Sequence, residues 1–271
     1  MSQNAADDHR TGIDSTVPHS ARFWNYLLGG KENYEVDREI GDYVREHFPR
    51  MVTVARESRL FLGRAVRYAV EQEGIRQFLD VGTGLPTADN THEIAQRCAP
   101  DARIVYVDND PLVLVHARAL LTSSPEGATN YVHADVREPA VILREAAATL
   151  DFAQPIGLVL MGVLGHVADT DEAARIVAEL LEALPPGSVL VHYEGTDTHE
   201  EMVAANDQYA TSGAIPYVVR TPDQVRELFR DLELVEPGVV PVSLWRPEID
   251  DPRADVDGYG GVGRKPEPGN D

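Results

Sequence analysis

The sequence predicts an α/β fold in which a mostly parallel sheet follows an N-terminal helical segment. Over residues 18–74, apolar side chains recur at helical spacing. After Gly74, short runs rich in β-branched residues alternate with helical stretches, an order typical of βαβ units with a parallel sheet. The 271 residues are enough for one large domain of this class.

Three helices are expected before the sheet. The first begins at Pro18, a residue that suits the first turn of a helix, and ends at Gly29 and Gly30. The second covers residues 36–49 and the third covers residues 53–74. Because few apolar residues precede these helices, we expect a flexible tail. The predicted organisation is a tail over residues 1–17, a helical cap over 18–74 and a core over 75–271.

Five strands are expected to alternate with four helices after Gly74. The strands are predicted at 77–81, 103–107, 129–133, 158–161 and 188–193, and the helices at 90–98, 111–121, 140–149 and 171–184. Residues 198–220 have no clear period and are typical of a lid insertion that covers a site. The later elements are predicted as a helix at 221–231, strands at 232–235 and 239–245, an acidic turn at 250–257 and a last strand at 259–265.

The charge of the chain disfavours two classes of partner. It has 24 Lys and Arg residues against 45 Asp and Glu residues, and its net charge is −21. Such an acidic surface repels nucleic-acid phosphates and anionic membranes. The longest apolar run, residues 156–165, is about half of the ~20 residues that cross a bilayer. We expect no nucleic-acid or membrane partner.

A cytoplasmic location is expected for two reasons. Residues 1–14 are polar and acidic and lack the apolar stretch of a secretory signal. Cys98 is the single cysteine, so no disulfide can form within the chain.

The most informative segment is FLDVGTGLP at residues 78–86. An apolar strand there passes through Asp80 into a turn that contains Gly82, Thr83 and Gly84. Glycines allow the backbone of such a turn to lie against a ligand without an intervening Cβ. The arrangement is typical of a loop that binds a nucleotide-like cofactor.

Polar residues follow the next two strands at the same edge of the sheet. Asp108 and Asn109 end the second strand, where a carboxylate can accept hydrogen bonds from both ribose hydroxyls. Asp135 and Val136 follow the third strand, where an adenine amine could bind. This succession is more specific than the glycine loop alone.

The loop favours a cofactor without phosphates. Dinucleotide loops have a third glycine and a helix N-terminus that holds the pyrophosphate, and here Thr87 occupies the glycine position after Pro86. Asp89 would place a negative charge beside a diphosphate. A sulfonium cofactor with a cationic amino-acid end suits Asp80 and an acidic pocket better. The sequence therefore predicts S-adenosylmethionine, with S-adenosylhomocysteine as the product, and disfavours NAD(P) and FAD.

Several motifs of the chain resemble those of a known family. DVGTG at 80–84, YVDNDP at 106–111 and HAD at 133–135 are similar to successive motifs of class I S-adenosylmethionine-dependent methyltransferases. VPHSARFWNYLLGGK at 17–31, FLDVGTGLPTADNTH at 78–92 and YGGVGRKP at 259–266 resemble an actinobacterial family of S-adenosyl methyltransferases. The resemblance implies a Rossmann-like, mostly parallel sheet of seven strands with a reversed last strand and an N-terminal helical extension.

Three residues are candidates for the reacting end of the site. Methyl transfer from a sulfonium requires alignment of the acceptor and, for an alcohol or phenol, removal of its proton. Substrates of open α/β sheets lie beyond the carboxyl ends of the strands. The fourth strand ends at Met161, which we expect beside the cofactor, and His166 follows as a candidate general base. Tyr193 and Glu194 hold the equivalent place after the fifth strand.

One cluster has side chains that can bind metals, and it contains His192, Glu194, Asp197 and His199. Alternate residues of a strand share a face, so the first two could point together. Because the spacing matches no recognised ligand set, we interpret the cluster as a solvated loop and expect no metal.

The predicted function is S-adenosylmethionine-dependent methyl transfer to a small-molecule acceptor, enclosed by the N-terminal helices and residues 198–220. No Asn/Asp-Pro-Pro-Tyr segment follows the fourth strand, which argues against methylation of a nucleobase amine. Two alternatives stay open: a non-catalytic protein that binds S-adenosylmethionine or a nucleoside, and an NAD(P)-dependent oxidoreductase. The fold itself hosts many activities.

Overall fold

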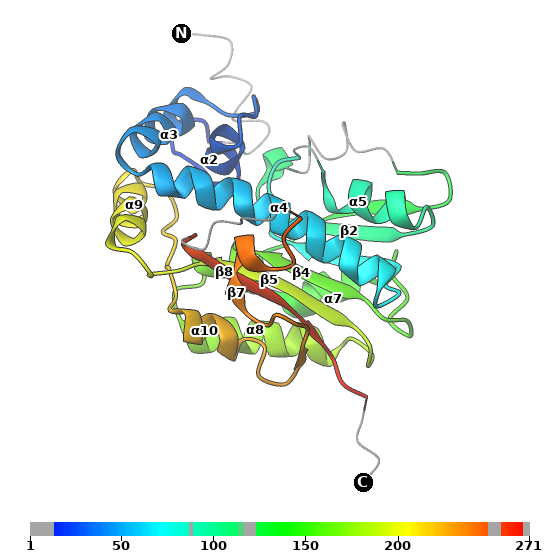
Figure 1. Cartoon of the computed structure of the whole chain (residues 1–271). Coiled ribbons are helices and arrows are strands. Elements are labelled where there is room, and N and C mark those ends of the chain that lie inside the picture. Colours follow the sequence, from blue (N-terminus) through cyan, green and yellow to red (C-terminus); the bar gives the residue numbers. More distant parts are fainter. Residues whose placement is uncertain (1–13, 87–88, 114, 116–122, 249–255, 268–271) are drawn as a thin grey trace.

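The computed structural model describes residues 14–86, 89–113, 115, 123–248 and 256–267. In this part of the chain, a central sheet lies between two layers of helices (Figure 1). Mostly parallel α/β sheets are covered in this way, because the crossover helices must lie on the faces of the sheet.

The sheet has eight strands in the described residues. They are β1 (Gln77–Val81), β2 (Arg103–Asp108), β3 (Ala128–His133), β4 (Gly157–Met161), β5 (Val189–Gly195), β6 (Glu233–Leu234), β7 (Val240–Pro241) and β8 (Gly258–Arg264). Their order is β3-β2-β1-β4-β5-β8-β6, and β7 also pairs with β8. Strands β1 to β5 pair in parallel, whereas β8 runs antiparallel to β5. The Rossmann-like fold with a reversed last strand is thus confirmed, and the two-residue β7 is the addition to the seven strands implied by the resemblance.

Alternating side chains of the strands pack into two separate cores, one on each face of the sheet. In β1, Phe78 belongs to one core and Leu79 to the other. Val159 and Leu158 of β4 divide in the same way. All four side chains are fully buried, as expected for parallel strands that are covered on both faces.

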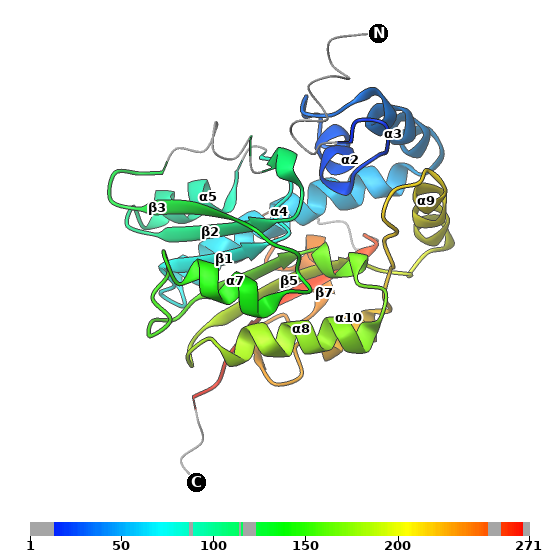
Figure 2. The same cartoon turned by 180° about the vertical axis from the view of Figure 1, so that it is seen from behind.

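Helices cover both faces and one end of the sheet. They are α2 (Ser20–Leu27), α3 (Glu35–His47), α4 (Pro49–Glu71), α5 (Thr91–Cys98), α7 (Pro139–Ala146), α8 (Thr170–Glu182), α9 (Glu200–Thr211) and α10 (Pro222–Glu227). Helices α4 and α5 lie on one face, and α7, α8 and α10 lie on the other (Figure 2). Helices α2, α3 and α9 gather around the N-terminal half of α4, beyond the strand ends.

The helices predicted for residues 18–74 correspond to α2, α3 and α4. Phe61 and Ala65 of α4 pack in the same core as Phe78 of the sheet. The last of the three helices is therefore part of the layered structure, while the division of the chain at residue 74 stays a prediction.

The strand predicted at residues 239–245 is wrong beyond Pro241. Residues 242–244 form a short 3₁₀ helix, η2 (Val242–Leu244), and the following Trp245 is fully buried. Nη2 and Nε of Arg64 donate to the carbonyl oxygens of Val242 and Trp245, at 2.7 and 2.9 Å. Arg64 therefore donates to carbonyl oxygens that would accept hydrogen bonds from a neighbouring strand if this segment were a strand.

Some predictions fall on residues that lie outside the described part of the chain. They concern most of the tail at 1–17, most of the helix at 111–121 and most of the acidic turn at 250–257. Among the described helices, none is long and apolar enough to cross a membrane.

Candidate active site

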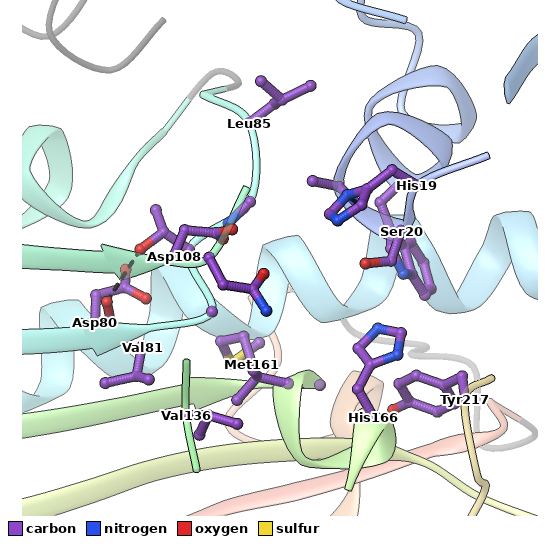
Figure 3. Close-up of a pocket in the computed structure, with 18 of the residues that line it drawn as sticks. His19, Ser20, Asp80, Val81, Leu85, Asp108, Val136, Met161, His166 and Tyr217 are labelled. Atoms are coloured by element: carbon purple, nitrogen blue, oxygen red, sulfur yellow. Dashed lines mark hydrogen bonds between the residues drawn. The ribbon is translucent and has the colours of Figure 1, made fainter. Parts of the chain in front are cut away.

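A cavity opens at the carboxyl ends of the parallel strands. It lies beside β1 and β4, where the strand order reverses and where ligands of open α/β sheets bind. Residues at the ends of β1, β2, β4 and β5 form one part of its lining. Helices α2 and α4, the 3₁₀ helix η1 (Val163–His166) and residues 215 and 217 form the rest (Figure 3).

The glycine loop after β1 is held against β2 and η1. The N–H groups of Gly82 and Thr83 donate to the carbonyl oxygen of Val107, at 2.8 and 3.2 Å. Gly82 has a φ of +74°, and a Cβ at this position would lie 2.3 Å from Cβ of Val163. Glycine is therefore required here by the backbone conformation and by the close approach of η1.

Asp108 is almost completely buried at the end of β2. Its Oδ2 accepts a hydrogen bond from the N–H of Gly84 at 2.8 Å, and its Oδ1 accepts one from the N–H of Asp110 at 2.9 Å. Burial raises the pKa of Asp108, while the two backbone N–H groups oppose the shift. A carboxylate can accept about four hydrogen bonds, so Asp108 can also receive a ribose hydroxyl.

Asn109, Asp135, Val136 and Met161 continue the lining on the same side. Nδ2 of Asn109 donates to Oδ2 of Asp135 at 3.0 Å, and the N–H of Arg137 donates to Oδ1 at 2.9 Å. Burial alone would raise the pKa of Asp135, but these hydrogen bonds outweigh it and lower the pKa. Every residue predicted to bind the cofactor thus lines this one cavity.

A cation and an anion lie close together at the α4 end of the cavity. Asp80 is buried, and its Oδ2 accepts a hydrogen bond from Oγ1 of Thr91 at 2.6 Å. Burial raises the pKa of Asp80 to about 6, although Thr91 and the charge of Arg59 oppose this. Nη2 of Arg59 donates to the carbonyl oxygen of Asp89 at 2.9 Å, and both Arg59 and Asp80 line the cavity.

Tyr193 reaches the cavity from β5 and is buried. Its hydroxyl lies near Ser58 of α4 and has no hydrogen-bond partner among the described residues. Burial raises the pKa of Tyr193 far above its usual range, so the side chain stays a neutral phenol.

His166 lies at the end of η1 and points into the cavity (Figure 3). Its Nδ1 is 3.1 Å from the carbonyl oxygen of Pro216, and its ring stands perpendicular to that of Tyr217 with 5.3 Å between the centroids. A carbonyl can only accept, so Nδ1 carries the proton and Nε2 carries the lone pair. Burial lowers the pKa of His166, which favours the neutral ring.

Glu194 is fully buried and does not line the cavity. Its Oε2 accepts a hydrogen bond from Nη1 of Arg220, and Nη2 of Arg220 donates to the carbonyl oxygen of Val167 at 2.7 Å. The pair connects β5 to the segment that follows η1 and to residue 220.

The expected solvated loop at 192–199 is only partly present. His192 and Glu194 are fully buried in β5, and Nδ1 of His192 donates to the carbonyl oxygen of Leu160 at 2.9 Å. His199 is half-exposed and contacts Asp257 instead. No group of three or more His, Cys, Asp or Glu side chains in the described residues could hold a metal ion.

The sequence prediction missed Ser58, Arg59 and Tyr217, which also line the cavity. A signal exists for Ser58, which is a polar residue on the buried stripe of α4 that also contains Ala55 and Leu62. Tyr217 belongs to the stretch at 198–220, which has no clear helical or strand periodicity, and no pattern in the sequence indicates that its side chain lines the cavity.

Comparison with known proteins identifies the family. A family model described as S-adenosyl methyltransferase matches residues 6–266, which is nearly the whole chain. The chain belongs to this S-adenosyl methyltransferase family. Its cofactor is therefore S-adenosylmethionine, and its activity is methyl transfer to an acceptor.

Two solved structures are similar over most of the methyltransferase. A DUF574 family protein from Streptomyces avermitilis is 44% identical, with a TM-score of 0.89 over 93% of this chain and 99% of the other. A candidate methyltransferase from Thermobifida fusca is 41% identical, with a TM-score of 0.86 over 94% of this chain and 97% of the other. The carbon methyltransferase CurJ shares the fold alone, at 14% identity and a TM-score of 0.54 over 83% of this chain and 61% of the other. No curated protein matches the chain significantly.

Proposed function

We propose that this methyltransferase acts on a small-molecule acceptor bound between α2, η1 and residues 215–217. One observation carries the proposal: the glycine loop and Asp108 share a cavity with His166 (Figure 3). The net charge of −21 argues against a nucleic-acid acceptor. A cytoplasmic location is part of the proposal, because Cys98 is alone in the chain and can form no internal disulfide.

The residues of the cavity fit the parts of S-adenosylmethionine. Asp108 would accept hydrogen bonds from the ribose hydroxyls, with Asn109 nearby. Asp80 would bind the ammonium group of the methionine part and Arg59 its carboxylate, since a zwitterion needs one charge of each sign. The remaining contacts would come from residues that line the cavity without a charge of their own: Gly82, Thr83, Gly84, Val136 and Met161. Asp135 would lie at the adenine.

The chain's own side chains would support the reaction in three ways. The bound cofactor supplies an electrophilic methyl group. His166 would accept a proton from the acceptor at Nε2, because Nδ1 is held by Pro216. Tyr193 would donate a hydrogen bond, since its pKa is too high for it to serve as a base. Glu194 would act indirectly, by holding Arg220 and the segment next to the cavity.

Calorimetric titration with S-adenosylhomocysteine tests the proposal. We expect binding to the wild type and about 10- to 100-fold weaker binding to Asp108→Ala, the range for lost charged hydrogen bonds of ~1.5–3 kcal/mol. Asp223→Ala is the matched control, because Asp223 lies on the surface in α10. A folded, cofactor-free sample that binds NAD(H) and not S-adenosylhomocysteine would support the oxidoreductase instead. Cofactor binding without turnover of any acceptor would favour the non-catalytic alternative.

A further inference from the structure

The cavity has two sides with different chemistry. Its three carboxylates, Asp80, Asp108 and Asp135, lie near the carboxyl ends of β1, β2 and β3. The facing side comes from α2, η1 and residues 215–217, and its lining has no carboxylate among the described residues. That side is made mainly of aromatic, apolar and imidazole groups, among them His19, Trp24, Leu28, His166, Ile215 and Tyr217, and Ser20 and Asn25 add neutral polar groups. His166 and Tyr217 lie together there, opposite Asp108 (Figure 3). We call this side the acceptor wall.

The carboxylates of the strand side have partners within the protein, and the proposed function assigns their remaining lone pairs to the cofactor. Asp108 accepts two backbone N–H groups, and Asp80 accepts the hydroxyl of Thr91. Asp135, which is charged and near enough to influence His166, accepts hydrogen bonds from Asn109 and Arg137. Asp110 contacts Nδ1 of His19 at 3.1 Å from behind the acceptor wall, but it does not line the cavity. A cationic acceptor at the acceptor wall would therefore lose its hydration without direct contact with a free carboxylate there.

The orientation of His166 makes the acceptor wall suitable for a group that donates a hydrogen bond. Its Nδ1 hydrogen bond to Pro216 leaves the lone pair on Nε2, which can accept a proton or a hydrogen bond but cannot donate one. An acceptor that meets Nε2 must therefore present a donor. A hydroxyl group does this and has lone pairs of its own for methylation, whereas a protonated amine has none.

The apolar part of the acceptor wall favours a planar ring beside that hydroxyl. Trp24, Leu28 and Ile215 line the same cavity as Tyr217, and Ile215 is about half exposed at 56%. Flat aromatic or conjugated compounds bury their faces well against such side chains.

We infer that the methyl acceptor is a planar compound with an acidic hydroxyl group, a phenol or an enol, and that it is methylated on oxygen with His166 as the general base. This inference rests on the proposed function. The acceptor oxygen forms its bond to the methyl carbon as the carbon–sulfur bond breaks, which leaves a neutral thioether. The hydroxyl proton passes to Nε2 of His166, so one positive charge is lost at sulfur and one is gained on the imidazole.

Paired probes test the inference on protein loaded with S-adenosylhomocysteine. Ligand-observed NMR titrations compare 4-methylphenol with 4-methylbenzylamine, which has the same ring and a cationic amine. We expect 4-methylphenol to bind at least tenfold more tightly. His166→Phe should reduce this preference by weakening the binding of 4-methylphenol, and it should keep the affinity for S-adenosylhomocysteine, which also shows that the variant is folded. His166→Asn is the second variant, and His47→Asn, at an exposed position of α3, is the control that should retain the preference.

The outcomes separate the inference from the proposed function. No binding of S-adenosylhomocysteine to the folded wild type would overturn the proposed function. When S-adenosylhomocysteine binds normally, three results overturn the inference alone: the amine binds as tightly as the phenol, neither probe binds, or the preference is undiminished in both His166 variants. With S-adenosylmethionine in place of the product, mass spectrometry should detect the methyl ether of 4-methylphenol.

Discussion

At the scale of single residues, the site depends on buried charges whose ionisation differs from that of exposed side chains. Asp80 shows this most clearly, because it is buried beside the cavity and has a pKa of about 6. A carboxyl group with a raised pKa stabilises the folded protein only while it is protonated. This contribution is complete at low pH and is lost as the pH rises through 6.

We therefore predict that Asp80→Asn changes the pH dependence of stability. Without ligand, the variant and the wild type should be similarly stable near pH 4. By pH 7 the variant should be more stable by on the order of 3 kcal/mol, since the wild type must then ionise a buried carboxyl group. Urea denaturation of both proteins from pH 4.5 to 7.5 measures the difference. If the difference in free energy of unfolding between the two proteins does not increase with pH, the pKa of Asp80 is not raised.

Arg59 provides a second prediction at this scale. Arg59→Gln should weaken binding of S-adenosylhomocysteine by about 10- to 100-fold, because a charged partner of the carboxylate is lost. Binding of 5′-methylthioadenosine, which lacks the amino-acid part, should be unchanged. Calorimetry with both ligands makes the comparison. Arg67→Gln, on an exposed position of the same helix, should bind both ligands like the wild type. Equal losses for the two ligands would place Arg59 elsewhere in the site.

At the scale of elements, the acceptor wall depends on the packing of η1 against the segment at 215–217. Gly165 of η1 lies so close to Tyr217 that a Cβ would be 2.2 Å from Cε2 of its ring. The N–H of Gly195 also donates to the hydroxyl of Tyr217 at 3.1 Å, and the N–H of Val218 donates to the carbonyl oxygen of Gly165 at 2.7 Å. Tyr217 is thus fixed between η1 and β5.

Gly165→Ala should therefore destabilise the protein by about 1–3 kcal/mol, the usual cost of overpacking. Gly63→Ala is the matched control, because a Cβ at Gly63 in the middle of α4 would meet nothing within 4 Å. That substitution should stabilise the protein by about 0.5–1 kcal/mol, since alanine favours a helix. Chemical denaturation measures both changes. If the free energy of unfolding changes in the same direction in both variants, the packing argument for Gly165 is wrong.

At the scale of the whole molecule, Asp257 connects parts that are far apart in the sequence. It is fully buried just before β8, and its Oδ2 accepts a hydrogen bond from Nε of Arg50 in α4 at 2.6 Å. Its Oδ1 accepts one from Oγ1 of Thr198 at 2.7 Å and also contacts His199. Burial alone would raise the pKa of Asp257, but these partners outweigh it and lower the pKa.

Asp257→Ala should lower the free energy of unfolding by about 2–3 kcal/mol at pH 7, because it leaves Arg50 and Thr198 without their buried acceptor. The loss should shrink as the pH falls below about 4, because the unfolded chain then binds a proton at Asp257, whereas the native carboxylate, with its lowered pKa, is protonated only at still lower pH. Glu248→Ala is the control, since it breaks an exposed ion pair with Arg67 and should cost at most about 1 kcal/mol. Similar losses in the two variants would show that Asp257 has no special role.

Much of the fold and the cofactor-binding side of the site could be predicted from local patterns. The strands β1 to β5 and the last strand β8 follow from short apolar runs between turn residues, and these patterns do not depend on distant contacts. Gly82, Asp108 and Asp135 follow from strand ends, because parallel strands bring their carboxyl ends to one edge. The strand predicted beyond Pro241 failed because Arg64, far away in α4, binds the carbonyls of that segment.

The fold class, the edge of the sheet that forms the site and the family of the enzyme could all be predicted from the sequence. These depend on periodicity and on residues close together in the chain. The three-dimensional arrangement was needed to show that Glu194 pairs with Arg220 outside the cavity, that Arg59 lies near Asp80, and that Pro216 orients His166. Each of these contacts joins residues at least 20 positions apart, and their energies depend on burial that no local pattern encodes.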